Sequence, residues 1–224
     1  MSYDAVLLDY DGVVVRVLDD ADRTPAFREL LAERFRDERL EFDDSVADSL
    51  AHSVSAEKLR RLSERTGLDA EQLWRHRDDA LSEVLRDAAR DGRKGPYDDV
   101  DALAELAVPL GIASNNQRRV VEFITDEYGL RERFETIHAR EPHPDSLDRK
   151  KPEPTFLDAA IADLDAENPL YVGDKETDVI AGERAGADTA LIRRAHNADR
   201  SIERRPTYEI ESLRAVVEIV ESAA

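Results

Sequence analysis

The chain has 224 residues, a formal net charge of −19 and an isoelectric point of about 4.7, and this length suits one large or two small domains. The acidity excludes nonspecific nucleic-acid binding, and the absence of cysteine excludes disulfides and thiolate metal sites. No apolar run approaches the roughly 18 residues of a membrane span, and the N-terminus shows no secretory signal. We therefore expect a cytoplasmic protein without nucleic-acid or membrane partners.

Lysine is scarce in this chain, because only five of its 32 basic residues are lysines. An acidic surface with little lysine is typical of adaptation to a salty cytoplasm, where salt screens the repulsion between like charges. We therefore predict a halophilic protein, whose stability depends on salt.

The stretch from Asp4 to Val15, DAVLLDYDGVVV, organises the chain. Its apolar run predicts a buried strand, and Asp9 and Asp11 leave that strand on the same side, roughly 7 Å apart. Gly12 then permits a sharp turn. Two carboxylates at the mouth of a buried strand repel each other, which favours a hard divalent cation bound by oxygen atoms. A helix cap or a solvated turn is the alternative.

The next part of the chain has helical periodicity. Residues 13–18 form a short apolar flap, Thr24-Pro25 predicts a helix start, and helical spacing of apolar residues continues to about Asp91. We expect a small helical bundle there. The glycines and the proline of residues 91–96 indicate a hinge.

Strands and helices alternate in the remainder, which predicts a parallel sheet covered by helices, an α/β fold of the Rossmann-like three-layer type. The expected strands are residues 108–113, 136–139, 170–172 and 189–192. The expected helices are residues 98–106, 117–127, 155–164, 176–185 and 211–221.

The segment between the first two strands is far longer than the roughly 30 residues of a βαβ unit. We predict a catalytic core of residues 1–15 and 95–224 and an inserted helical domain of residues 16–94. Ligands of open α/β sheets bind at the carboxyl ends of the strands. The inserted domain is therefore expected to cover the site as a lid.

Further polar residues follow the other predicted strands. Ser114-Asn115-Asn116 precede a helix, whose N-terminus favours an anion such as phosphate, although an ordinary cap is the alternative. Proline at position 152 fixes the backbone beside Lys151, which favours Lys151 as a residue of the site. The alternative is that Lys151 is a solvated surface lysine. Asp174 and Asp178 follow a buried strand and face the same side of a helix start, where helix capping is the alternative.

Together these motifs resemble the haloacid dehalogenase-like (HAD) superfamily of phosphohydrolases. The matching motifs occur in the family's order: DYDGV at 9–13, SNN at 114–116, KPEP at 151–154 and GDKETD at 173–178. The helical insertion resembles the family's C1 cap, as in relatives of phosphoglycolate phosphatase and β-phosphoglucomutase. The resemblance spans the predicted core, and the cap carries no matching substrate motif.

The resemblance implies a Mg²⁺-dependent phosphatase that acts on a small phosphorylated metabolite through an aspartyl-phosphate. Asp9 is implied as the nucleophile and Asp11 as the acid and base for the leaving alcohol and the attacking water. Mg²⁺ is implied to bind Asp9, the backbone carbonyl of Asp11, and Asp174. Dehalogenases of the family lack an acid at the position of Asp11, since a halide leaves without a proton.

The resemblance also implies how the phosphoryl group is held. Ser114 and Lys151 are implied to bind its oxygen atoms, with Asn115 as a further contact. Asp178 is implied to orient Lys151 or a metal-bound water without binding the phosphoryl group itself. A phosphomutase, a phospho-accepting receiver module and an inactive binding scaffold remain as alternatives. The oligomeric state, monomer or homodimer, stays open, and so does the substrate.

Overall fold

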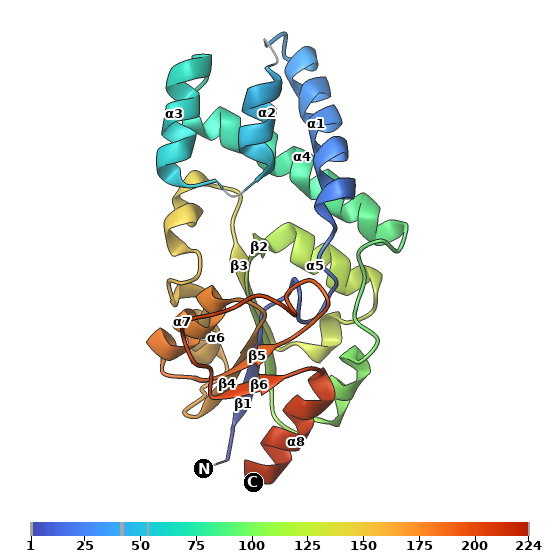
Figure 1. The fold of residues 1–224 in the computed structure, drawn as a ribbon, viewed down its shortest axis with the longest axis vertical. Helices are drawn as coiled ribbons and strands as arrows, with labels where there is room; N and C mark the ends of the chain where they lie inside the picture. The colour runs from blue at the N-terminus through green and yellow to red at the C-terminus, as the bar shows by residue number, and fades with distance from the viewer. Residues whose placement is uncertain (1, 41–42, 53, 224) are drawn as a thin grey trace. The chain divides into compact units, whose positions relative to one another are not determined.

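The protein contains a six-stranded parallel sheet, shown in the computed structural model, which describes residues 2–40, 43–52 and 54–223 (Figure 1). Its strands are β1 (Ala5–Leu8), β2 (Leu110–Gln117), β3 (Thr136–Arg140), β4 (Pro169–Gly173), β5 (Asp188–Ile192) and β6 (Tyr208–Ile210). Their order is β3-β2-β1-β4-β5-β6. Parallel sheets are covered on both faces, and accordingly every residue of the central strand β1 is buried. The predicted α/β fold class is confirmed.

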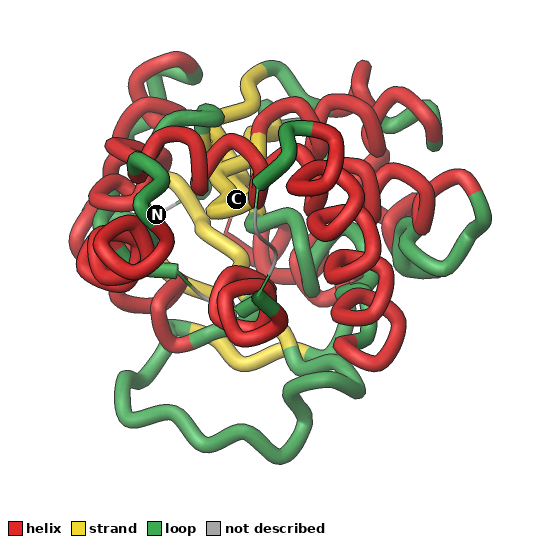
Figure 2. Tube along the Cα trace, turned by 90° about the horizontal axis from the view of Figure 1, so that it is seen from above, coloured by secondary structure: helices red, strands yellow, loops and turns green. Residues whose placement is uncertain are grey.

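Helices alternate with these strands along the chain and surround the sheet, as Figure 2 shows by colour. They are α5 (Arg118–Glu127), α6 (Thr155–Asp163), α7 (Glu176–Ala185) and α8 (Leu213–Ala223), with the 3₁₀ helices η1 (Val100–Glu105) and η2 (Arg131–Arg133). Side chains of the sheet and of α6 and α7 share one core cluster, which includes Leu7, Leu157, Tyr171 and Ala181. This packing fixes the strand ends from which the site is built.

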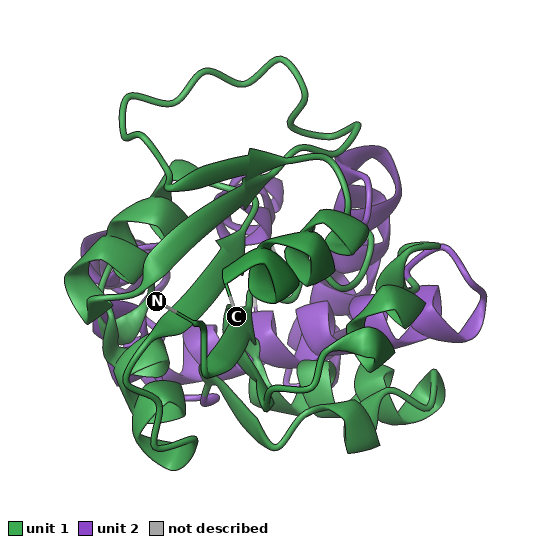
Figure 3. Ribbon diagram, turned by 90° about the horizontal axis from the view of Figure 1, so that it is seen from below, with its two compact units in different colours: residues 1–17, 95–140, 149–224 green, residues 18–94, 141–148 purple. Residues whose placement is uncertain are grey.

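Four further α-helices belong to a second compact unit (Figure 3). They are α1 (Asp20–Asp37), α2 (Asp44–Ala51), α3 (Ala56–Thr66) and α4 (Ala70–Arg90). The 3₁₀ helix η3 (Pro144–Arg149) belongs almost entirely to the second unit. The unit comprises residues 18–94 and 141–148, and the sheet unit comprises residues 1–17, 95–140 and 149–224. The predicted helical bundle is thus present, and its role as a cap stays a prediction. Residues 1, 41, 42, 53 and 224, which fall within the predicted domain ranges, lie outside the described residues.

Helix ends follow their capping residues. Ser55 and Asp69 cap α3 and α4 through their side chains, and Gly67 ends α3 in the left-handed region at φ 73°. The expectation for α1 was wrong, because that helix begins at Asp20 and not after Thr24. The Asp19 side chain accepts a hydrogen bond from the Ala21 N–H and starts the helix, so Pro25 falls inside it.

Three other expectations also needed correction. The helix expected at residues 98–106 is the shorter 3₁₀ helix η1 of Val100–Glu105, and the short strand β6 was missed. Strand β2 runs on to Gln117, because Gln117 pairs with Arg140 of β3 beyond a shift in register. Among the described helices, none combines the length and the apolar character that crossing a bilayer requires.

Candidate active site

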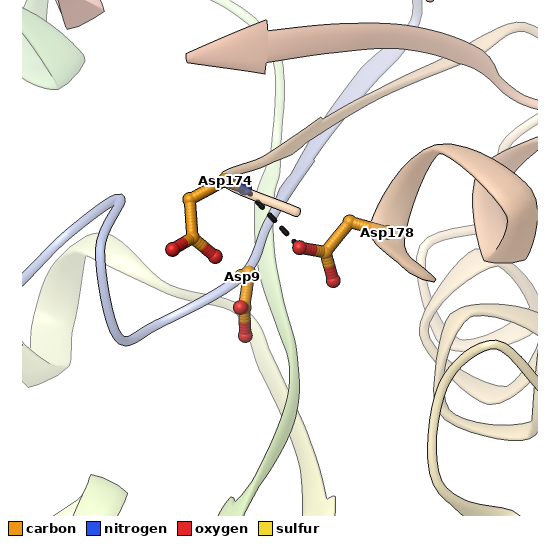
Figure 4. A group of neighbouring side chains, drawn as sticks. All are labelled: Asp9, Asp174 and Asp178. Carbon is orange, nitrogen blue, oxygen red and sulfur yellow. Dashed lines mark hydrogen bonds between the residues drawn. The ribbon is translucent and has the colours of Figure 1, made fainter. Parts of the chain in front are cut away.

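Two acidic residues from separate strands meet at the carboxyl edge of the sheet. Asp9 follows β1, and its N–H donates to the Val172 carbonyl of β4 at 2.8 Å, so the pairing of these neighbouring strands continues to the site. Asp174 follows β4 directly, and both acids are buried. Asp178 in the first turn of α7 joins them, and one ligand oxygen from each of the three lies within 4.8 Å of the others (Figure 4).

Two glycines make room for this cluster. A Cβ at Gly173 would lie 2.2 Å from the Asp178 Cβ, so no other residue allows α7 to bring this acid so close. Gly12 has φ +90°, and a Cβ there would lie 2.4 Å from Asp174 Oδ2. The glycines in the DYDGV and GDKETD motifs are therefore required by space, and Gly12 also by its backbone conformation.

Lys151 provides a buried positive charge between the acids. Its Nζ lies 2.8 Å from Asp9 Oδ1 and 2.7 Å from Asp178 Oδ1. It also donates to the Tyr171 hydroxyl at 2.6 Å and to the Ala113 carbonyl at 3.1 Å. An ammonium group carries three hydrogens, so the protein offers at least as many acceptors as Lys151 has donors.

Asn115 holds the backbone of Lys151. The Asn115 Oδ1 accepts from the Lys151 N–H at 2.8 Å, and its Nδ2 donates to the Lys151 carbonyl at 3.2 Å. Both polar ends of this amide are therefore used to fix the loop before α6. Its predicted contact with phosphate is untested and stays a prediction.

The remaining polar residues of β2 face the same edge, but as part of a strand. The structure places Ser114, Asn115 and Asn116 at the end of β2, and only Gln117 separates them from α5, so they lie just before a helix as expected. Asn116 Nδ2 donates to Asp11 Oδ2 at 2.7 Å and orients that carboxylate. The Ser114 hydroxyl is buried and accepts from the Asn116 N–H at 3.2 Å.

Asp178 links the two halves of the cluster. Its Oδ2 accepts from the N–H groups of Asp174 at 3.2 Å and Lys175 at 3.0 Å, while its Oδ1 pairs with Lys151. These contacts fix the turn that carries Asp174. They match the expectation that Asp178 orients Lys151, and this role remains a prediction.

Burial and the surrounding charges shift the ionisation of the site. Burial raises the pKa of Asp9 to about 6, although the Lys151 ammonium opposes this shift. For Lys151, burial favours loss of the proton, but Asp178 and Asp9 outweigh it and hold the pKa above its usual value. Burial also acts to raise the pKa of Asp174, but hydrogen bonds from His196 and Lys175 outweigh it and lower that pKa.

Several residues that contact this cluster, among them Tyr171, His196 and Asn197, were not expected from the sequence. The Tyr171 hydroxyl lies beside Lys151, His196 Nε2 lies 2.7 Å from Asp174 Oδ2, and Asn197 Nδ2 donates to the Asp174 carbonyl at 2.7 Å. Tyr171 sits in an apolar run that indicates only a strand. His196 and Asn197 lie in an irregular loop without a recognisable pattern.

The donor set fits a hard divalent cation. Asp9, Asp174 and Asp178 offer clustered carboxylate oxygens, and oxygen ligands are those that Mg²⁺ prefers. Lys151 and Lys175 are the cations seen to pair with these three acids among the described residues, so negative charge is left over in the cluster. A divalent cation bound there would offset that excess.

Comparison with known proteins agrees with this arrangement. The family model of haloacid dehalogenase-like hydrolases matches residues 3–186. Phosphoglycolate phosphatase 1 of Pseudomonas aeruginosa is 31% identical over 133 residues, which cover 58% of this chain and 47% of the relative. (S)-2-haloacid dehalogenase of Pseudomonas sp. (strain YL) is 30% identical over 138 residues, which cover 59% of this chain and 58% of the relative.

Among solved structures, CbbY from Rhodobacter sphaeroides in complex with phosphate has a TM-score of 0.67 at 17% identity, covering 96% of each chain. This similarity shows the fold. The chain spans about half the length of the curated relatives that it matches. The chain belongs to the haloacid dehalogenase-like hydrolase family, whose model covers most of its length.

Proposed function

We propose that this protein is a Mg²⁺-dependent phosphatase that acts on a small phosphorylated metabolite through an aspartyl-phosphate on Asp9. One observation carries the proposal: the Asp9 carboxylate and the Lys151 ammonium lie 2.8 Å apart in a buried site that also contains Asp174. A nucleophile for phosphorus and a cation for the phosphoryl oxygens are thereby side by side. Relatives named as phosphoglycolate phosphatases support this reaction class.

In this mechanism Asp9 attacks phosphorus, and the bond between phosphorus and the ester oxygen breaks. The aspartyl-phosphate is then hydrolysed by water, which returns Asp9 and inorganic phosphate. Lys151 and Ser114 hold the phosphoryl oxygens as their charge redistributes. Since the protein already surrounds the Lys151 ammonium with acceptors, a phosphoryl oxygen binds it by displacing one of them.

Asp11 moves the proton in both halves of the reaction. It protonates the leaving alcohol and later takes a proton from the attacking water. The hydrogen bond that Asn116 Nδ2 donates to Asp11 Oδ2 at 2.7 Å orients this carboxylate for the task. A halide leaves without a proton, so the presence of Asp11 favours phosphate esters over the haloacids named for one relative.

The proposed metal ligands are Asp9, the backbone carbonyl of Asp11, and Asp174. Asp178 belongs to the same cluster of carboxylates. Bound Mg²⁺ supplies positive charge that offsets the repulsion between these carboxylates and the phosphoryl group. The proposal predicts that EDTA abolishes activity and that added Mg²⁺ restores it. Full activity in chelator would exclude a metal requirement.

A phosphomutase, which passes the phosphoryl group to a second sugar hydroxyl, is the nearest alternative. Relatives named as phosphoglycolate phosphatases support transfer to water. The test is a panel of phosphorylated metabolites, including phosphoglycolate and the glucose phosphates, assayed with Mg²⁺ for both inorganic phosphate and isomerised sugar. Release of phosphate supports the proposal, and isomerisation without release would refute it. Cytoplasmic location and salt adaptation stay predictions.

A further inference from the structure

His196 lies in the loop of residues 193–207, which joins β5 to β6 (orange to red in Figure 1). Its Nε2 is 2.7 Å from Asp174 Oδ2. A carboxylate only accepts hydrogen bonds, so Nε2 is the nitrogen that carries the hydrogen in this contact. The Tyr97 hydroxyl lies 3.4 Å from His196 Nδ1, which accepts from it when the imidazole is neutral. One line of contacts therefore runs from Tyr97 through His196 to Asp174.

The loop that carries His196 is tied to the turn that carries Asp174. Buried Asn197 donates through Nδ2 to the carbonyls of Asp174 at 2.7 Å and Ile192 at 3.0 Å. Farther along the loop, Glu176 Oε1 accepts from the N–H groups of Glu203 at 2.7 Å and Arg204 at 2.8 Å. The position of the imidazole is thus set by the same backbone that presents the acid.

Tyr97, on the other side of the imidazole, is also fixed in place by its neighbours. The Arg194 guanidinium lies 4.1 Å from the centre of the Tyr97 ring and pairs with both oxygens of Asp99 at 2.8 and 2.9 Å. At the near side, a Cβ at Gly12 would lie 2.9 Å from His196 Nε2. The imidazole therefore fills a defined place between the DYDGV turn and Tyr97.

The two oxygens of Asp174 have different kinds of partner. Oδ1 pairs with Lys175 at 2.8 Å. Lysine has a long, flexible side chain, and that of Lys175 is 42% exposed. Oδ2 is bonded to His196, whose loop is anchored at several points. The hydrogen bond from His196 therefore determines the orientation of the Asp174 carboxylate.

We propose that His196 is a positioning residue that holds the Asp174 carboxylate in the orientation that binds the divalent cation. The inference rests on the proposed function, which makes Asp174 a metal ligand. Hydrogen-bond partners of metal ligands typically contribute about 10- to 100-fold to metal affinity. His196 thereby extends the metal centre to the loop between β5 and β6.

The test is calorimetric titration of substrate-free protein with MgCl₂. Asp174→Asn provides the background from nonspecific binding to the acidic surface. His196→Leu removes the hydrogen bond at similar size, and His196→Gln keeps an amide donor. His138→Leu is the matched control, because His138 Nε2 also lies 2.7 Å from an aspartate, Asp163, with 24% of its side chain exposed against 25% for His196.

We expect His196→Leu to weaken Mg²⁺ binding about 10-fold or more, His196→Gln to restore most of it, and His138→Leu to leave it unchanged. The inference is overturned if His196→Leu binds Mg²⁺ like the wild type, or if His138→Leu weakens binding as much. A wild type that hydrolyses phosphate esters with Mg²⁺ while His196→Leu binds Mg²⁺ normally refutes this inference alone. A wild type that binds Mg²⁺ no better than Asp174→Asn refutes it together with the proposed metal site.

Discussion

Lys151 and Asp9 form an ion pair of 2.8 Å in which both side chains are almost fully buried. The two residues come from the loop before α6 and from the end of β1, far apart in the sequence. Removing charges from water is costly unless each is paired and hydrogen-bonded. The pair therefore makes the stability of the sheet edge depend on the same groups as the proposed chemistry.

Replacing the buried ammonium tests this dependence. We expect Lys151→Met to lower the free energy of unfolding by about 3 kcal/mol, because it leaves Asp9 and Asp178 buried without their cation. Denaturant unfolding measures the change. Lys150→Met is the control, because it alters the neighbouring, less buried lysine, and its effect should be clearly smaller. Equal stability of Lys151→Met and the wild type would show that the pair contributes nothing.

Asp9 is predicted to be indispensable for turnover. Asp9→Asn keeps the size of the side chain but removes the nucleophilic oxygen, so we expect activity to fall about a thousandfold or more. Circular dichroism should show an unchanged secondary structure. Substantial activity in a folded variant would exclude covalent catalysis by Asp9.

The proposed acid role of Asp11 predicts an effect that depends on the leaving group. Asp11→Asn should slow hydrolysis of alkyl phosphates by about 100-fold, since an alkoxide needs a proton to leave. Hydrolysis of p-nitrophenyl phosphate should suffer less, because p-nitrophenolate leaves readily. Rates for both substrates, measured side by side, check this, and equal losses would argue against an acid at position 11.

Asp99 is predicted to stabilise the fold in a pH-dependent way. Burial acts to raise the pKa of Asp99, but Arg194 and the Leu213 N–H outweigh it, so the pKa is lowered. Its stabilisation is therefore present above the usual aspartate pKa of about 4 and is lost as the pH falls through the lower value in the folded state. We expect Asp99→Asn to cost about 1 kcal/mol at neutral pH, and less as the pH falls below about 4.

Unfolding measured from neutral pH to about pH 3 checks this prediction. Asp98→Asn is the matched control, because the neighbouring Asp98 side chain is fully exposed and should change little. A difference between Asp99→Asn and the wild type that stays constant over this range would contradict the assigned pKa shift.

Much of the fold was predictable from local patterns. The apolar runs that become β1 and β4 are short and continuous, as expected for buried parallel strands, and α7 begins and ends where the pattern indicates. The end of β2 was not predictable, because its pairing with β3 beyond Ser114 depends on a distant strand. Strand β6 has three residues and gives too short a signal.

The site was predictable where its residues stand at fixed positions next to strands, as do Asp9 and Asp174. Lys151 was suggested by the neighbouring proline, and its position beside Asp9 required the fold. His196 was missed, because its place beside Asp174 is set by the path of an irregular loop. Asn115 lies near the end of β2 as the sequence indicated, but its contacts with the Lys151 backbone were not foreseen.

The most direct test of the central claim is to trap the phosphorylated enzyme. The protein is mixed with a hydrolysable phosphate ester and Mg²⁺, quenched with acid during turnover, and digested with trypsin, which releases residues 1–16 as one peptide. Mass spectrometry should find a phosphate on Asp9 in the wild type and none in Asp9→Asn. Turnover without any phosphorylated peptide, or a phosphate on the same peptide of Asp9→Asn, would contradict the proposal.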